Sequence, residues 1–179
     1  MFINLTDVLT SEDEVLTMQV ETEMTEVSIG RELFRILDKT PVRFTFTNVG
    51  KNKAVIDGEA EFTFAVNCDR CLKPMEEKLT IRFSREVHSP DAVSDSYDEA
   101  DTEDDDQNFM EGYQLNVEDL LNNEIMINWP RKVLCKPDCK GICMQCGKDL
   151  NTGDCGCDSF VPDPRMAVIK DIFHANKEV

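Results

Sequence analysis

The sequence predicts an α+β protein with an antiparallel, β-rich amino-terminal region, a helix, and a cysteine-rich metal-binding module that ends in a short helix. Three observations support this fold class. Apolar and polar residues alternate between residues 42 and 87, as they do in half-buried strands. A helical pattern begins after Asn116, and six of the eight cysteines follow it, between residues 135 and 157. We expect three regions: residues 1–89, 90–107 and 108–179.

Three consecutive segments carry the strand pattern, over residues 42–49, 54–66 and 78–87. In the first, Val42, Phe44 and Phe46 alternate with polar residues, and β-branched and aromatic side chains suit a pleated, half-buried surface. We expect three antiparallel strands, with a turn at residues 50–52 between the first two. The pair Cys68 and Cys71 then lies in a hairpin-like connection between the second and the third strand.

The segments around these strands are less regular. Residues 13–21 alternate loosely, and residues 27–37 mix apolar and charged residues without a clean period. Residues 90–107 are rich in Asp, Glu, Ser and Ala, so they cannot bury enough apolar surface to offset the entropy of ordering. We expect a disordered acidic insert there, and one short strand over residues 109–115.

The helix that follows has clear end signals. Asn116 is a good N-cap, and acidic residues in the first turn suit the helix dipole. Pro130 ends the helix, and we expect Trp129 to pack on the sheet. A last helix is predicted from Asp163 or Pro164, because proline is tolerated in the first turn.

Charge is distributed unevenly along the chain, whose net charge is -17. Residues 86–128 hold 14 acidic and no basic residues, whereas residues 68–85 have a local charge of +2 and residues 129–149 of +3. Both cysteine clusters therefore lie in net-positive segments. A metal that brought the clusters together would also gather the candidate RNA-binding residues Arg70, Lys73, Lys132, Lys136 and Lys140.

The expected compartment favours metal over disulfides. Residues 1–14 contain no basic residue and no apolar run of the kind found in secretory signals. We therefore expect a cytoplasmic protein, in which thiols stay reduced unless a metal holds them. The cysteine content is also below the roughly 8–10 % typical of small disulfide scaffolds. Structural metal is thus favoured over redox chemistry and over disulfides.

The later cysteines form a C-x2-C-x8-C-x-C pattern, made by Cys143, Cys146, Cys155 and Cys157. Four thiolates in a short loop leave no open coordination position, which indicates a structural zinc ion. The other four could form a second zinc site that joins the strand connection to the later module: Cys68, Cys71, Cys135 and Cys139. An interleaved arrangement, with Cys139 grouped with Cys143 and Cys146, remains open from spacing alone.

That interleaved spacing, C-x3-C-x2-C, also matches the cluster-binding pattern of radical S-adenosylmethionine enzymes. Such enzymes need an α/β barrel, which neither the remaining length nor the pattern of the chain supports. A thioredoxin-like function is equally weak, because no βαβ context surrounds either C-x2-C pair. His88 and His174 have no nucleophile at a recognisable spacing, and no phosphate-binding glycine loop is present. We therefore do not expect an enzyme.

Several motifs in register resemble one bacterial family. They are C-D-R-C-L at residues 68–72, L-C-K-P-D-C-K-G-I-C-M-Q-C-G-K-D-L-N at 134–151, C-G-C at 155–157 and D-P-R at 163–165. Together they resemble the YceD family, the large ribosomal RNA subunit accumulation proteins. The resemblance implies a part in the synthesis, processing or accumulation of this RNA, without known catalysis.

Two functions follow as expectations. The first is a non-enzymatic ribosome-biogenesis factor that binds ribosomal RNA precursor or an assembly protein on a zinc-stapled basic surface. The second is a zinc-dependent adaptor whose acidic insert engages basic ribosomal proteins. Neither involves a membrane or a small-molecule substrate.

Overall fold

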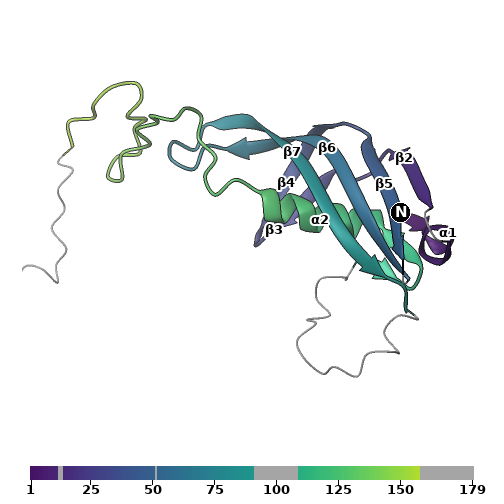
Figure 1. Ribbon diagram of the computed structural model, residues 1–179. Coiled ribbons are helices and arrows are strands. Elements are labelled where there is room, and N and C mark those ends of the chain that lie inside the picture. Colours follow the sequence, from purple (N-terminus) through teal and green to yellow (C-terminus); the bar gives the residue numbers. More distant parts are fainter. Residues whose placement is uncertain (12–13, 51, 91–108, 158–179) are drawn as a thin grey trace, which may run out of the picture. The chain divides into compact units, whose positions relative to one another are not determined.

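The computed structural model describes residues 1–11, 14–50, 52–90 and 109–157. Its contacts divide the chain into two units: Met1–Asn67 with Pro74–Val133, and Cys68–Lys73 with Leu134–Val179. Apart from its first residue, the predicted acidic insert lies outside the described residues, and so does the predicted last helix. Figure 1 shows the elements of the first unit.

The first unit is built on an antiparallel sheet of six strands. The strands are β2 (Val15–Val20), β3 (Glu26–Ile29), β4 (Glu32–Lys39), β5 (Val42–Gly50), β6 (Lys53–Asn67) and β7 (Pro74–His88). β4 and β5 pair one after the other with the same edge of β6, while β7 pairs along its whole opposite edge. β3 extends the sheet beyond β4, and β2 extends it beyond β5.

The core follows from the alternation in these strands. Every second residue of β6 from Ala54 to Val66 is buried, and the intervening residues are partly or fully exposed. One face of the sheet therefore carries the buried apolar side chains. Those that are fully buried include Phe44, Phe46, Phe62, Phe64, Ile56 and Ile81. The three predicted strands are confirmed, although β7 begins four residues earlier than expected.

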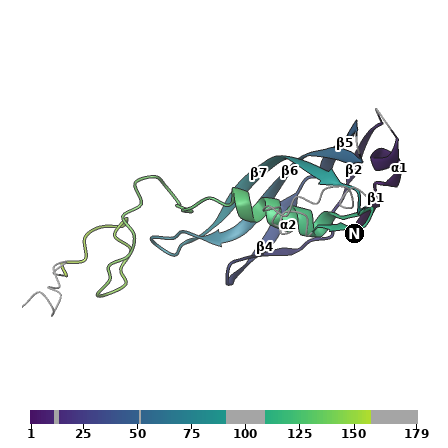
Figure 2. The same cartoon turned by 60° about the horizontal axis from the view of Figure 1, so that its bottom comes forward.

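One helix covers this apolar face, as Figures 1 and 2 show. α2 (Val117–Asn128) begins at the predicted N-cap, where the Asn116 side chain accepts hydrogen bonds from the backbone N–H groups of Glu118 and Asp119. After it, the ring centroid of Trp129 lies 4.6 Å from that of Phe34 and 5.0 Å from that of Phe64. The predicted helix and the predicted packing of Trp129 on the sheet are confirmed.

A small second sheet joins the amino terminus to the segment before α2. It has the order β1 (Phe2–Asn4), β9 (Gln114–Asn116), β8 (Met110–Glu111), and α1 (Thr6–Thr10) follows β1. The single strand predicted over residues 109–115 is therefore wrong. A turn at Gly112, whose φ is +63°, folds that segment into two short strands.

The described residues contain no helix that is both long and apolar enough to cross a membrane.

Candidate metal centres

The eight cysteines form two groups of four, and all are free thiols. The first tetrad is Cys68, Cys71, Cys135 and Cys139, and the second is Cys143, Cys146, Cys155 and Cys157. The sulfur atoms of each tetrad lie within 4.8 Å of one another. The interleaved grouping of Cys139 with Cys143 and Cys146 is therefore not the arrangement in the structure.

The sulfur separations of the first tetrad suit a tetrahedral ion. The Sγ atoms of Cys68 and Cys139 are 3.8 Å apart, and those of Cys71 and Cys135 are 3.6 Å apart. Metal–sulfur bonds of about 2.3 Å in a tetrahedron give sulfur–sulfur edges of about 3.8 Å. A disulfide needs about 2.05 Å. Each tetrad could thus hold one metal ion, with all four positions filled by protein.

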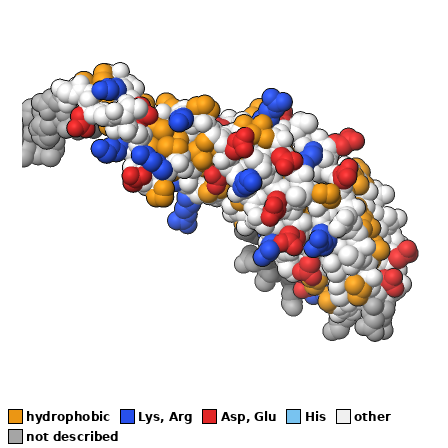
Figure 3. Space-filling view, turned by 90° about the horizontal axis from the view of Figure 1, so that it is seen from above, with side chains coloured by type: hydrophobic (Ala, Val, Ile, Leu, Met, Phe, Trp, Pro, Cys, Tyr) orange, Lys and Arg blue, Asp and Glu red, His pale blue; other side chains and the backbone are white. Residues whose placement is uncertain are grey.

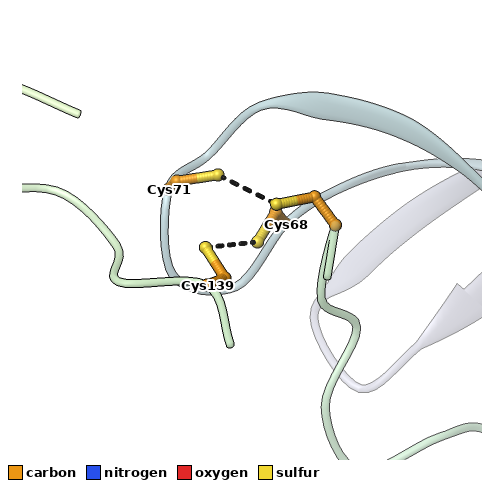
Figure 4. Close-up of side chains that lie close together, drawn as sticks. Cys68, Cys71 and Cys139 are labelled. Carbon is orange, nitrogen blue, oxygen red and sulfur yellow. Dashed lines mark hydrogen bonds between the residues drawn. The ribbon is translucent and has the colours of Figure 1, made fainter. Parts of the chain in front are cut away.

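The first tetrad begins in the connection between β6 and β7, as the sequence predicts. The backbone N–H of Leu72 donates to the carbonyl of Cys68, and the N–H of Cys68 donates to the carbonyl of Lys73, both at 2.9 Å. We call this closed turn, residues 68–73, the first knuckle. In Figure 4 the sulfur atoms of Cys68, Cys71 and Cys139 are turned toward one another.

Arg70 fastens the first knuckle to the later cysteines. Its Nη1 donates to the carbonyl of Cys139 at 2.7 Å, and its own carbonyl accepts from the N–H of Ile142 at 3.1 Å. Gly141 makes this approach possible. Its φ is +80°, and a Cβ there would lie 3.0 Å from the Arg70 carbonyl oxygen. These contacts bring Cys135 and Cys139 to Cys68 and Cys71 across more than 60 residues of sequence.

The second tetrad contains a knuckle with the same hydrogen bonds. The N–H of Gly147 donates to the carbonyl of Cys143 at 2.8 Å, and the N–H of Cys143 donates to the carbonyl of Lys148 at 2.9 Å. We call residues 143–148 the second knuckle. Gly147 has φ +73°, where Leu72 in the first knuckle has φ +59°. The two C-x2-C turns are therefore equivalent in backbone, although their residues differ.

Asn151 links the two tetrads. Its Nδ2 donates to the Sγ of Cys139 at 3.4 Å and to the carboxylate of Asp149 at 2.7 Å. Its Oδ1 accepts from the backbone N–H of Lys140 at 2.9 Å. Cys139 belongs to the first tetrad, while Asn151 lies in the loop between Cys146 and Cys155 of the second. No feature of the cysteine spacing marks Asn151, and its position in a D-x-N-T-G turn is the single hint.

Within the first tetrad the thiols differ in acidity. Backbone N–H groups of Cys135 and Cys71 stabilise the Cys68 thiolate and lower its pKa to about 6. Hydrogen bonding with Cys71, together with partial desolvation, raises the pKa of the Cys135 thiol to about 12. Cys68 is thus already a thiolate at neutral pH and can bind a metal ion directly. The ion must displace protons from other thiols of the tetrad, such as Cys135.

The second tetrad repeats this asymmetry. Backbone N–H groups of Cys146 and Gln145 lower the pKa of Cys143 to about 6. Hydrogen bonding to Cys146 and Cys155 raises the pKa of Cys157 to about 12. The tetrads differ in exposure, however. Three cysteines of the first are buried, whereas those of the second are half-buried or exposed.

Comparison with known proteins decides the family. The family model of the large ribosomal RNA subunit accumulation protein YceD matches residues 56–173, which is more than half of the chain. The chain belongs to the YceD family. The match begins in β6 and runs through both tetrads, so the candidate metal centres lie inside the family region. The family takes its description from accumulation of the large ribosomal RNA subunit.

Individual relatives add little about function. Uncharacterized proteins of Mycobacterium bovis and of two Mycobacterium tuberculosis strains are each 28% identical over 83 residues. The match covers 46% of this chain and 38% of each relative. The chain therefore matches less than two fifths of the length of these relatives. No solved structure matches the chain.

The five candidate RNA-binding residues are all exposed, but they do not all share one unit. Arg70, Lys73, Lys136 and Lys140 belong to the second unit, and Lys132 belongs to the first. Lys136 lies 3.9 Å from the carboxylate of Asp138. On the first unit, Figure 3 shows acidic and basic side chains interspersed over the visible face. Glu59, for example, is paired with both Arg43 and Arg82.

Metal would reverse the charge of the second unit. Its described residues carry five cations, Arg70, Lys73, Lys136, Lys140 and Lys148, and four aspartates, which leaves +1 without the cysteines. A divalent ion held by four thiolates has a net charge of about -2. With both tetrads filled, the described part of the unit would carry about -3. The positive local charge seen in the sequence is therefore offset by the centres that organise it.

Proposed function

We propose that this YceD-family chain is a non-enzymatic factor in accumulation of the large-subunit ribosomal RNA, and that two zinc ions hold its second unit in a binding-competent form. Cytoplasmic ribosome precursors would be its site of action. The observation that carries the proposal is the pair of four-thiolate centres within the family region. Closed tetrahedral sets of cysteine favour zinc and leave no coordination position for a substrate.

Zinc would act here as a scaffold. Cys68 and Cys71 sit between two long paired strands, whereas Cys135 and Cys139 follow α2 by sequence. An ion shared by these four residues closes a long loop, which stabilises the folded arrangement by restricting the unfolded chain. The residues between and around the cysteines are then available for binding.

The first binding route is direct contact with RNA precursor. Exposed lysines contact phosphates without base specificity, so the partner would be recognised by shape and backbone charge. The proposed residues are Lys73, Lys132, Lys136 and Lys140, together with Arg70. Arg70 also donates to the Cys139 carbonyl, so its loss would alter the metal site as well as the surface.

Crosslinking followed by sequencing of the bound RNA tests this route. The test variant changes Lys73, Lys132, Lys136 and Lys140 to Ala and retains Arg70. The matched control changes four exposed cations of the first unit to Ala: Arg31, Arg35, Lys78 and Arg82. Loss of large-subunit precursor RNA in the test variant alone, at unchanged zinc content, is the expected result. Equal recovery by both variants would refute direct contact through these lysines.

A protein adaptor is the second candidate, and the charge of the metal-filled second unit favours it. A chain of net charge -17, whose second unit would also be acidic when filled, attracts basic proteins more readily than phosphates. Residues 91–107 would add to this attraction. Deleting them should weaken pull-down of purified large-subunit proteins while leaving zinc content unchanged. If the deletion leaves the pull-down unaltered, the acidic insert does not take part in binding these proteins.

A further inference from the structure

Leu72 combines two features that are rarely found together. Its side chain is 61% exposed, and its φ of +59° lies in the left-handed region. Among the described residues, the other positive φ values belong to seven glycines and to Asn52. Leucine is disfavoured in this conformation because its Cβ crowds the following carbonyl, whereas asparagine tolerates it. The chain thus holds a large apolar side chain in solvent at a conformational cost.

The second knuckle shows that the backbone does not require leucine there. Gly147 occupies the equivalent position, makes the equivalent hydrogen bond to Cys143, and has φ +73°. Glycine meets the same geometry without strain. The requirements of the turn and of its metal ligands therefore do not explain Leu72.

Core packing does not explain it either. The hydrophobic core of the described residues is formed mainly by the two sheets, α1 and α2, and it does not include Leu72. Most of the Leu72 side chain remains in water, so it adds little to folding. A strained backbone position that carries an exposed apolar side chain, with no use in the turn or in the core, points to a contact outside the chain.

We propose that Leu72 is an apolar anchor, which inserts into a pocket on a basic protein of the large ribosomal subunit or of its assembly. The inference rests on the proposed function. Of the two candidate functions given there, it favours the protein adaptor over direct RNA binding. The partner pocket would be apolar inside and lined at its rim by Lys or Arg side chains.

The charges around Leu72 select a protein over RNA. Two of the nearby cations have partners within the chain: Arg70 donates to the Cys139 carbonyl, and Lys136 pairs with Asp138. Asp149 has its pKa lowered by hydrogen bonds from Asn151 and by the charges of Lys73 and Lys136, so its carboxylate is ionised. The cations around the first tetrad (Arg70, Lys73, Lys136 and Lys140) and the aspartates (Asp69, Asp138 and Asp149) leave a local charge of +1, so a filled first tetrad, at about -2, would leave a surplus of about -1. That surplus repels phosphates and attracts a basic rim.

Binding of the zinc-loaded full chain to two purified probes tests the proposal. One probe is the RNA-free protein fraction of large ribosomal subunits, with bound proteins identified by mass spectrometry. The other is a protein-free transcript of large-subunit ribosomal RNA. The test variant is Leu72→Gly, which relieves the strain and removes the side chain. Leu72→Met keeps an apolar side chain, and Met144→Ala removes a 94% exposed apolar residue from the second knuckle.

We expect Leu72→Gly to retain its zinc and an equal or higher unfolding midpoint, yet to bind an identified basic protein at least about tenfold more weakly. Leu72→Met and Met144→Ala should bind within about threefold of the unchanged chain. Equal binding by Leu72→Gly would overturn the proposal. So would an effect of Leu72→Gly on the RNA probe alone.

A cellular measurement separates this inference from the proposed function. The ratio of large-subunit to small-subunit ribosomal RNA is compared in cells that lack the chain and in cells that carry Leu72→Gly. If deletion leaves the ratio unchanged, the proposed function itself is wrong. If deletion lowers the ratio and Leu72→Gly restores it fully, the Leu72 inference alone is wrong.

Discussion

Asn151 donates from Nδ2 to the Sγ of Cys139 at 3.4 Å, so a residue of the second tetrad's loop supports a ligand of the first. Such hydrogen bonds orient a thiolate and spread its charge. The same side chain accepts from the backbone of Lys140, directly after Cys139. The two centres are thus coupled through one amide group. Disorder in the loop between Cys146 and Cys155 would therefore weaken the first tetrad.

Asn151→Ala should therefore weaken the first tetrad, although Asn151 is not a ligand. The expected loss of metal affinity is about tenfold, in the range found for outer-shell partners of metal ligands. Chelator competition gives the affinities, and cadmium NMR of the substituted protein resolves the two sites. Asp154→Asn, an exposed change in the same loop, is the control. A loss confined to the second tetrad would show that the hydrogen bond does not couple the centres.

Gly141→Ala should also disturb the first tetrad. The residue has φ +80°, and the new Cβ would lie 3.0 Å from the Arg70 carbonyl oxygen. A left-handed Ala costs about 1–2 kcal/mol, and the clash adds to that. Gly147→Ala is the matched control, because its φ is +73° but its Cβ would meet open space. Urea unfolding of the zinc-loaded proteins should show the larger loss for Gly141→Ala, and equal losses would argue against the close approach.

The buried carboxylate of Glu124 makes the first unit sensitive to one substitution. Glu124 is 2% exposed, and its Oε1 accepts from Arg85 Nε at 2.6 Å, which joins α2 to β7. Arg85→Ala leaves this carboxylate without its cation, so unfolding free energy should fall by about 3–5 kcal/mol.

Arg82→Ala provides the comparison in denaturant unfolding. Arg82 pairs with Glu59 on the exposed face, and its loss should cost about 0–1 kcal/mol. Similar losses for the two variants would mean that the Arg85 pair is no more important than a surface pair.

Metal affinity should fall as the pH falls, and more steeply below about pH 6. Cys68 and Cys143 have pKa values lowered to about 6, so each is a thiolate above that pH in the metal-free protein. Below it, zinc must displace one further proton at each site. Chelator competition between about pH 5 and pH 7.5 should show this added slope of about one proton per site. An unchanged slope through pH 6 would contradict the assigned acidities.

Strong alternation and capping made the central elements predictable from sequence. β5 and β6 are apolar at every second position, and Asn116 marks the start of α2. The hairpin of β3 and β4 was not predictable in this way. Leu33 and Leu37 are exposed, and a bulge between Ile36 and Asp38 shifts the register, so the apolar period is broken. α1 has five residues and no side-chain cap, which leaves no sequence signal.

The cysteine ligands of the candidate metal centres were predictable from the sequence. The hydrogen bonds that hold these ligands in place were not. Spacing alone suggests the second tetrad, because its four cysteines are close in sequence. The contacts of Arg70 with Cys139 and Ile142 have no such signal, since they join residues about 70 positions apart. From the sequence alone, Arg70 is therefore expected only as an RNA-binding surface cation. The structure shows a guanidinium that also fixes the position of a ligand.

Native mass spectrometry of the intact chain, with elemental analysis of the same sample, tests the two centres most directly. In each of the two tetrads, the four free cysteines lie close enough together to coordinate one ion tetrahedrally. We therefore expect a mass increase of two zinc ions per chain. The increase should be lost when a chelator is added at low pH. One zinc ion per chain, no bound metal, or stoichiometric iron with sulfide would contradict the two-zinc assignment.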